Sequence, residues 1–221
     1  MKKLIPLVLM AAACSGSNLS LSVRAGSSAA SSASSLTLSN GIAVSRIRIV
    51  VRDIKLERAR SADAGNDELE EHEMQAGPFL VDLSGTTLDS GAPAQLAAAS
   101  LPAGTYREIK FKIHRPESSE SSDAGIQAMA TAGASIVADG TIDGAAFSFS
   151  TPMDVEQEVE GSFDLASGSN LTLNVDPSGW FGGSVRLDPR DASVRGQIES
   201  NIQHSFKAFK DDNHDGHDDG D

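Results

Sequence analysis

The residues with the clearest capacity for chemistry stand near the C-terminal end of the sequence, where oxygen-bearing side chains alternate. Asp211, Asn213 and Asp215 precede Gly216, and Asp219 follows them. Calcium takes six to eight oxygen ligands, and carboxylates at alternate positions beside a tight glycine turn can present them. The spacing therefore predicts a weak calcium site formed by Asp211, Asn213, Asp215 and Asp219.

This D-x-N-x-D-G spacing is similar to the opening half of EF-hand-like and thrombospondin-type calcium loops. The similarity is partial, because the sequence stops at Asp221, before the bidentate Glu that such loops have at the twelfth position. Two alternatives stay open. In the first, residues 211–221 form a disordered, solvated acidic tail, as charge runs commonly do. In the second, His214 and His217 bind zinc or copper.

Motifs of the common catalytic classes are missing from the sequence. It contains no GxSxG, HExxH or CxxC pattern and no phosphate-binding loop. No histidine has a Ser or Cys nucleophile placed beside it by the sequence. The acidic residues are interpreted as a solvated surface, so the prediction is a protein that is not an enzyme. A hydrolase of the cell envelope that uses clustered acidic residues is the rival interpretation.

Cys14 is the only cysteine, and it ends a stretch with the features of an export signal. Lys2 and Lys3 supply positive charge, residues 4–10 are mostly apolar, and residues 11–13 are alanines. The apolar run is far shorter than the roughly 20 residues of a membrane-spanning helix. We therefore expect residues 1–13 to be removed as a signal peptide, and a single cysteine permits no intramolecular disulfide.

The residues that lead up to Cys14 resemble the lipobox of bacterial lipoproteins, small-small-small-Cys. The resemblance implies that Cys14 carries diacylglycerol and becomes an acylated N-terminus after cleavage. Two or three acyl chains anchor a protein stably to a membrane, whereas one chain does so marginally. Ser15 stands where Asp would retain an enteric-type lipoprotein, which implies sorting to the outer membrane. The alternative is a plain secretory signal in which Cys14 is incidental.

The charge balance bears on the class of partner. The sequence has 18 Lys and Arg against 31 Asp and Glu, a formal net charge of −13, and loss of Lys2 and Lys3 leaves 16 against 31, or −15. Nucleic-acid binding needs an excess of basic residues at the phosphates, so this balance argues against it. It suits a module held at a membrane surface, with an envelope protein as a candidate partner.

Composition divides the rest of the sequence into segments. Residues 14–35 are rich in Ser, Gly and Ala and are predicted to be a disordered tether, because such a stretch cannot bury enough surface to fold. Residues 36–181 alternate apolar and polar residues between Gly-rich turns, among them Asn40-Gly41 and Asp143-Gly144, which is typical of short antiparallel strands. We expect a mainly β domain there, an antiparallel β-sandwich.

Local patterns add further expectations inside this domain. The apolar face of the strand near residues 42–56 changes at Arg52-Asp53, which predicts a bulge. Residues 95–99 are expected to form a helical turn, and residues 117–134 a loop. The aromatic pair Trp180-Phe181 is interpreted as a plug of the core. The alternative is a stacking surface in a carbohydrate- or small-ligand-binding module.

Charged residues recur at alternate positions on three of the predicted strands. The expectation is that opposite charges on neighbouring strands neutralise one another on the solvent-exposed face. The alternative is a basic patch for an anionic partner such as lipid headgroups. The residues are Arg46, Arg48 and Arg52 on one strand, Lys110, Lys112 and His114 on a second, and Asp154, Glu156, Glu158 and Glu160 on a third.

The strand RIRIVVRDIKLE and the turn-strand LPAGTYREIKFKI, taken with the lipobox, resemble those of a bacterial lipoprotein domain of unknown function. The resemblance covers about residues 36–180 and implies a transthyretin- or Ig-like sandwich, in which Tyr106 stands where a corner tyrosine is often found. The family has no established catalytic residues. It therefore implies a binding or structural module and assigns no site.

The last element is expected to be an amphipathic helix within residues 182–210, packed against the sandwich. Asp191 or Ser193 is placed to cap its start. Its apolar residues recur at helical spacing and are Val194, Ile198, Ile202, Phe206 and Phe209.

Overall fold

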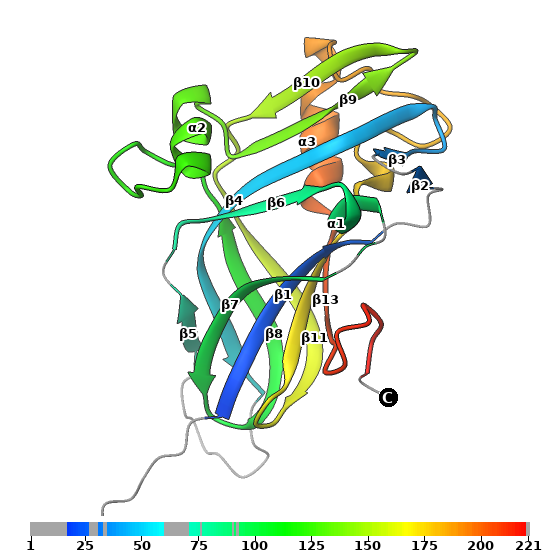
Figure 1. The fold of residues 1–221 in the computed structure, drawn as a ribbon. Coiled ribbons are helices and arrows are strands. Elements are labelled where there is room, and N and C mark those ends of the chain that lie inside the picture. Colours follow the sequence, from blue (N-terminus) through cyan, green and yellow to red (C-terminus); the bar gives the residue numbers. More distant parts are fainter. Residues whose placement is uncertain are drawn as a thin grey trace, which may run out of the picture.

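The computed structural model consists of two β-sheets packed together, with short helices around them (Figure 1). The smaller sheet has four strands in the order β13 (Phe206–Lys210), β12 (Asn170–Val175), β1 (Ser17–Ala25) and β7 (Ala94–Leu101), and the larger sheet has nine. The mainly β sandwich predicted from the sequence is confirmed. No helix in the described part of the chain is long and apolar enough to cross a membrane. The structure describes residues 17–26, 31–32, 35–59, 71–75, 77–89, 91 and 93–219.

Strand β4 (Ile42–Arg58) is the longest strand of the larger sheet and pairs on both sides. Its first half lies between β9 and β6, because Ile47 pairs with both Ala138 and Leu83. Its second half lies between β8 and β5. The other strands of this sheet are β2 (Ser31–Ser32), β3 (Ser35–Thr37), β5 (Glu71–Gln75), β6 (Phe79–Ser84), β8 (Gly104–Ile113), β9 (Ile136–Ile142), β10 (Ala145–Thr151) and β11 (Val155–Leu165).

The predicted bulge in β4 is confirmed. The register of pairing with β8 shifts between Arg52 and Lys55, and Asp53 has a positive φ of 53°. Because a bulge adds one residue, the core side of the strand passes from Val51 to Ile54. Both turn signals are confirmed as well: Gly41 turns β3 into β4, and Asp143-Gly144 joins β9 to β10.

The prediction of a disordered tether over residues 14–35 is wrong for much of its length. Strand β1 (Ser17–Ala25) lies inside the smaller sheet, parallel to β12 (Asn170–Val175) and antiparallel to β7 (Ala94–Leu101). Four small or medium apolar side chains alternate along it and are all buried. They are Leu19, Leu21, Val23 and Ala25. The serines around them give the segment the composition of a linker, so its strand pattern is not evident from composition. The sandwich therefore begins well before residue 36, and it contains one parallel pair among antiparallel ones.

Two other local predictions are corrected. Residues 95–99, expected as a helical turn, belong to β7, because pairing with β1 outweighs the helix preference of alanine. Residues 117–134, expected as a loop, contain α2 (Ala124–Ala132), which Asp123 caps by accepting the Ile126 N–H at 2.9 Å. Met129 of α2 packs on Val50 in a small second cluster outside the main core.

The chain crosses between the sheets after β11, so β12 does not continue the sheet of β11. The short helices α1 (Thr86–Asp89), η1 (Pro177–Gly179) and η2 (Ala192–Val194) lie in connections, and Asp191 caps η2 by accepting the Ser193 N–H. The C-terminal helix α3 is Arg195–Gln203, shorter than predicted. Phe206 and Phe209 belong instead to β13 (Phe206–Lys210), because pairing with β12 captures them.

Candidate functional site

The predicted calcium residues lie in one folded loop that follows β13. The loop closes where the Asp219 N–H donates to the Lys210 carbonyl at 2.8 Å. Inside it, the Asp215 N–H donates to Asn213 Oδ1 at 2.8 Å, and Gly216 turns the chain with a φ of 83°. Residues 211–219 are therefore not a disordered tail, and that alternative is wrong for this stretch.

Asp211 is the anchor of this loop, and its side chain is fully buried. Its carboxylate accepts the Thr172 hydroxyl at 3.0 Å and the Gly216 N–H at 3.2 Å. Asn170 donates its side-chain amide to the Asp211 carbonyl at 3.0 Å and accepts the Ser22 hydroxyl at 3.0 Å. These bonds join the loop to β12 and β1 through a buried polar network, which satisfies groups that burial would otherwise penalise.

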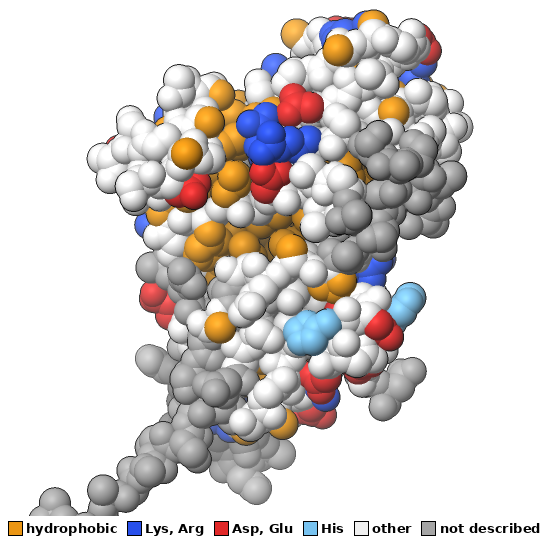
Figure 2. Space-filling view, in the orientation of Figure 1, with side chains coloured by type: hydrophobic (Ala, Val, Ile, Leu, Met, Phe, Trp, Pro, Cys, Tyr) orange, Lys and Arg blue, Asp and Glu red, His pale blue; other side chains and the backbone are white. Residues whose placement is uncertain are grey.

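The four oxygen-bearing side chains of the loop mostly accept N–H groups from the loop itself. Asp219 accepts both the backbone and the side-chain N–H of Asn213, at 3.2 and 3.1 Å. Arg24 of β1 donates to the Gly216 carbonyl and places a positive charge beside the loop. In the described residues no three His, Cys, Asp or Glu side chains are grouped to hold a metal ion. Figure 2 shows histidine and acidic side chains gathered over this region. The calcium site stays a prediction.

A second cluster of charges lies on the outer side of β4 and β8. Glu57, with a side chain 2% exposed, accepts Lys110 Nζ at 2.9 Å and Arg107 Nε at 2.6 Å. Burial alone would raise the pKa of Glu57, but the hydrogen bonds from Lys110 and Arg107 lower it below its usual value. The sequence did not single out Glu57, because its donors come from another strand.

Glu108 lies opposite Glu57 in the register of β4 and β8 and behaves differently. Its carboxylate lies 3.8 Å from Lys110 Nζ. Burial raises the pKa of Glu108, the charge of Lys110 opposes this, and the negative charges of Glu158 and Glu57 add to the rise. The two carboxylates therefore share one lysine unequally.

The third cluster surrounds His114, which is buried where β8 ends. Its Nε2 is 2.8 Å from Glu120 Oε2, and its Nδ1 is 3.5 Å from Asp154 Oδ2. Arg52 of the β4 bulge reaches the same Glu120 at 3.1 Å. The pKa of Glu120 is lowered, first by the Glu117 N–H, against burial, and then by His114. In the described interactions the ring meets the carboxylates of Glu120 and Asp154, so the cluster fastens the loop that follows β8.

The charge neutralisation predicted between strands holds for two of the three. On β8 and β11, Lys112 Nζ lies 2.7 Å from Asp154, and Lys110 and Lys112 stand opposite Glu158 and Glu156. The arginines of β4 use other partners. Arg46 pairs with Asp82 of β6, Arg48 with Asp139 of β9, and Arg52 with Asp53 and Glu120.

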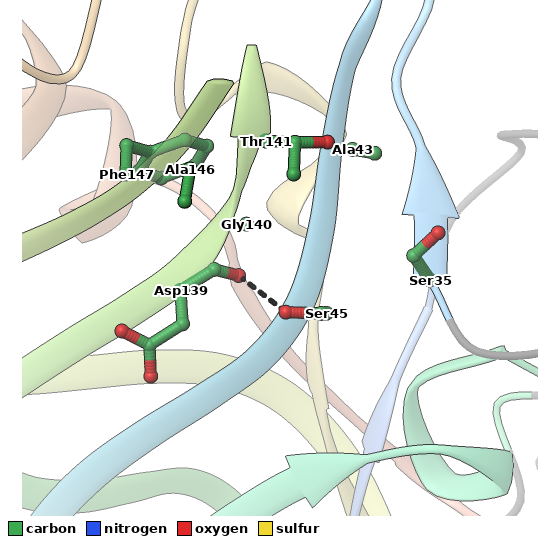
Figure 3. A pocket seen from close by; sticks show the side chains of 8 residues that line it. All are labelled: Ser35, Ala43, Ser45, Asp139, Gly140, Thr141, Ala146 and Phe147. Atoms are coloured by element: carbon green, nitrogen blue, oxygen red, sulfur yellow. Dashed lines mark hydrogen bonds between the residues drawn. The ribbon is translucent and has the colours of Figure 1, made fainter. Parts of the chain in front are cut away.

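An open groove of about 470 Å³ lies on the outer face of β3, β4, β9 and β10 (Figure 3). Small side chains line most of it, and Ser45 donates to the Asp139 carbonyl at 3.1 Å. The carboxylate of Asp139 is already occupied by Arg48 at 2.9 Å and by the Ser148 hydroxyl at 2.7 Å. The groove is therefore a concave surface that could hold a ligand, but few of its polar groups are free to bind one. Its lining is Ser35, Ala43, Ser45, Asp139, Gly140, Thr141, Ala146 and Phe147.

Trp180 and Phe181 are fully buried. Phe181 packs edge-on against Phe147 and Phe149, with ring centroids 5.4 and 5.9 Å apart. They are a plug of the core, as predicted, and cannot stack on a sugar at the surface. Tyr106 is also buried, and its hydroxyl donates to the Pro102 carbonyl four residues upstream at 2.8 Å, the bond expected of a corner tyrosine. Cys14 lies outside the described residues.

Comparisons with known proteins add little to these observations. No protein-family model matches the chain, and no curated protein does. Among solved structures, MbnP from Methylosinus trichosporium is similar with a TM-score of 0.43 and 10% sequence identity, over 77% of this chain and 78% of that one. Similarity of this degree supports no argument about function.

Proposed function

We propose that this chain is a lipid-anchored protein of the bacterial cell envelope, held at the outer membrane by acyl chains on Cys14. Its sandwich acts there as a binding or structural module and not as an enzyme. The observation that carries the proposal is the position of the single cysteine, directly after a basic, apolar and small-residue stretch. The resemblance of this stretch to a lipobox supports acylation of Cys14.

The test is replacement of Cys14 in the full precursor. Cys14→Ala is expected to abolish incorporation of labelled fatty acid and to leave unprocessed precursor or soluble protein. Ser15→Ala, one position along, is the matched control and is expected to keep both acylation and partition into detergent. A Cys14→Ala protein that still partitions fully with membranes and detergent would show that Cys14 is not the anchor.

A weak calcium site in the loop of residues 211–219 is a second candidate function. What favours it is that the D-x-N-x-D-G segment is folded, with its turn at Gly216 and its first residue, Asp211, held by β12. Titration calorimetry of the mature chain with calcium is expected to give a dissociation constant of about 10⁻⁴–10⁻³ M, the range of extracellular modules. Asn213 and Asp215 are exposed, so Asn213→Ala and Asp215→Ala should remove the heat of calcium binding without unfolding the sandwich. If the two variants give the same heats as the unchanged chain, the loop has a structural role and does not bind calcium.

The remaining alternatives have less in their favour. A carbohydrate-binding surface would need exposed aromatic side chains, and Trp180 and Phe181 are buried. A hydrolase that uses acidic residues would need a carboxylate free to act on substrate, whereas Glu57 and Glu120 are held by Lys, Arg or His. The open groove of Figure 3 keeps the small-ligand hypothesis as the one to test next.

A further inference from the structure

The start of β1 lies very close along the chain to Cys14. Only two residues, Ser15 and Gly16, separate Cys14 from Ser17, the first residue of the strand. Three peptide units span at most about 11 Å when fully extended. This limit holds whatever conformation those residues adopt, so the sandwich has little freedom to move away from an acylated Cys14.

The strand that begins there is held in the middle of its sheet. β1 pairs with β12 on one side over six register positions and with β7 on the other over seven. Its buried residues include Leu21, which is 0% exposed. The position of Ser17 therefore determines which end of the whole sandwich lies nearest to Cys14.

Two turns lie at that end, beside the folded loop of residues 211–219, in which Asp212 accepts the Asn170 N–H. Ser17 pairs with Leu101, where the turn into β8 begins, and Gly104 pairs with Leu165, where the turn from β11 to β12 begins. The exposed residues of these turns are small and uncharged, and the nearby Arg58 and Asp164 are engaged by the Ala103 carbonyl and the Thr105 hydroxyl. The exposed residues are Pro102, Ala103, Thr105, Ala166, Ser167 and Gly168.

From this geometry we infer that the sandwich stands on the bilayer with the Leu101–Thr105 and Ala166–Ser169 turns against the lipid headgroups. The inference rests on the proposed acylation of Cys14. The neutral turns meet the headgroups without burying an unpaired charge. The acyl chains supply the binding energy, and the short connection from Cys14 to Ser17 sets the orientation.

The opposite end of the sandwich faces away from the membrane. It carries the β9–β10 hairpin, whose tip residue Asp143 accepts one hydrogen bond from each terminal nitrogen of Arg186, at 2.9 and 3.0 Å. The neighbouring Val185 is 75% exposed. β4 runs between the two ends, and its 17 residues correspond to a separation of at most about 55 Å. This far end is the surface that an envelope partner would reach first.

β4 ends at Arg58, which pairs with Tyr106 at the membrane-facing end. The sequence that follows Arg58 is rich in acidic residues. They are Asp63, Asp67, Glu68 and Glu70. Anionic lipids should therefore not strengthen the contact, because like charges repel. The orientation is expected in zwitterionic vesicles and is expected not to improve when anionic lipid is added.

The experiment compares two exposed alanines at opposite ends of the acylated, full-length mature protein. Ala103→Cys and Ala145→Cys each receive a thiol-reactive fluorophore, since the thioether on Cys14 does not react. The proteins are bound to phosphatidylcholine vesicles that carry a quencher on the headgroup. The fluorophore at position 103 is expected to be quenched several-fold more strongly than the one at 145.

A length variant and a binding control separate the possible failures. Insertion of about 20 Gly and Ser residues after Gly16 gives a tether with a reach of about 25 Å and is expected to abolish the difference. If the protein does not float with vesicles, acylation itself fails. If it floats and the two positions are quenched equally, or position 145 more, the orientation is wrong while the lipid anchor stands.

Discussion

At the residue scale, Glu57 and Glu108 face each other across β4 and β8, and their ionisation has opposite effects on the stability of the fold. Both are buried, which penalises the charged form of each. Glu57 has two cations within hydrogen-bonding distance, whereas Glu108 shares one of them at a greater distance and is subject to the negative charge of Glu158. Ionisation of Glu57 therefore stabilises the fold, and ionisation of Glu108 opposes it.

Neutralising Glu57 and neutralising Glu108 are expected to change the free energy of unfolding in opposite directions. Because the pKa of Glu57 is lowered in the fold, its contribution is present above the pKa of the unfolded chain and is lost as pH falls through the folded value. Glu57→Gln should thus lower the free energy of unfolding at pH 7 by about 1–3 kcal/mol, the worth of hydrogen bonds to a charged group. The pKa of Glu108 is raised, so its ionisation costs stability as pH rises, and Glu108→Gln should increase the free energy of unfolding.

Urea unfolding of the mature chain at pH 7 and pH 3 is the measurement. Both differences should shrink at pH 3, where glutamates are largely protonated. Each variant is the control for the other, since the substitutions are the same and the positions face each other across β4 and β8. Destabilisation of similar size by both variants at pH 7 would contradict the unequal sharing of Lys110.

At the element scale, β1 decides whether the smaller sheet exists as one unit. It lies between β12 and β7, so without it β7 has no partner in that sheet among the described pairings. Its outer face contributes Ser22 to the polar network that holds the loop after β13, and its inner face contributes Leu21 to the core. A segment with the composition of a linker is therefore a central structural strand.

Truncation of Leu21 distinguishes a strand from a tether. Leu21→Ala is expected to lower the free energy of unfolding by about 2–5 kcal/mol, because it leaves a cavity between two packed sheets. Val185→Ala, at a side chain 75% exposed, is the control and should change it by less than about 0.5 kcal/mol. Chemical denaturation gives both values. A Leu21→Ala protein as stable as the control would return residues 17–25 to the role of a flexible tether.

At the scale of the whole molecule, the charge of the mature chain and its pairing oppose binding to anionic surfaces without an acyl chain. Removal of residues 1–13 leaves 16 basic against 31 acidic residues. The basic residues of β8 are engaged, Lys110 by Glu57 and Lys112 by Asp154. No unoccupied basic patch on this strand remains for headgroups.

Sedimentation with anionic vesicles checks this at the level of the intact chain. The mature chain with Cys14→Ala is expected to stay in the supernatant, because its net charge is repelled by the surface. Adding Lys110→Ala and Lys112→Ala is expected to change nothing. Vesicle binding that these two substitutions abolish would instead establish the basic patch.

The sequence alone predicted the features that depend on neighbouring residues. Alternation of apolar residues identified most strands of the sandwich, and glycine after Asn40 and Asp143 marked two hairpin turns. The switch of apolar face at Arg52-Asp53 placed the bulge correctly. The resemblance of the residues before Cys14 to a lipobox is a local pattern too, and acylation of Cys14 remains a prediction. Such features are readable because backbone conformation over a few residues depends on those residues.

Only the tertiary structure decided the features that depend on distant partners. The serine-rich stretch became a strand because β12, about 150 residues later, supplies its hydrogen bonds, and Phe206 left the helical pattern because Val175 pairs with it. Asp211 is a buried anchor and not part of a solvated tail, because the Thr172 hydroxyl donates a hydrogen bond to its carboxylate. Pairing free energy between such segments exceeds local preference, and no window of sequence contains both partners.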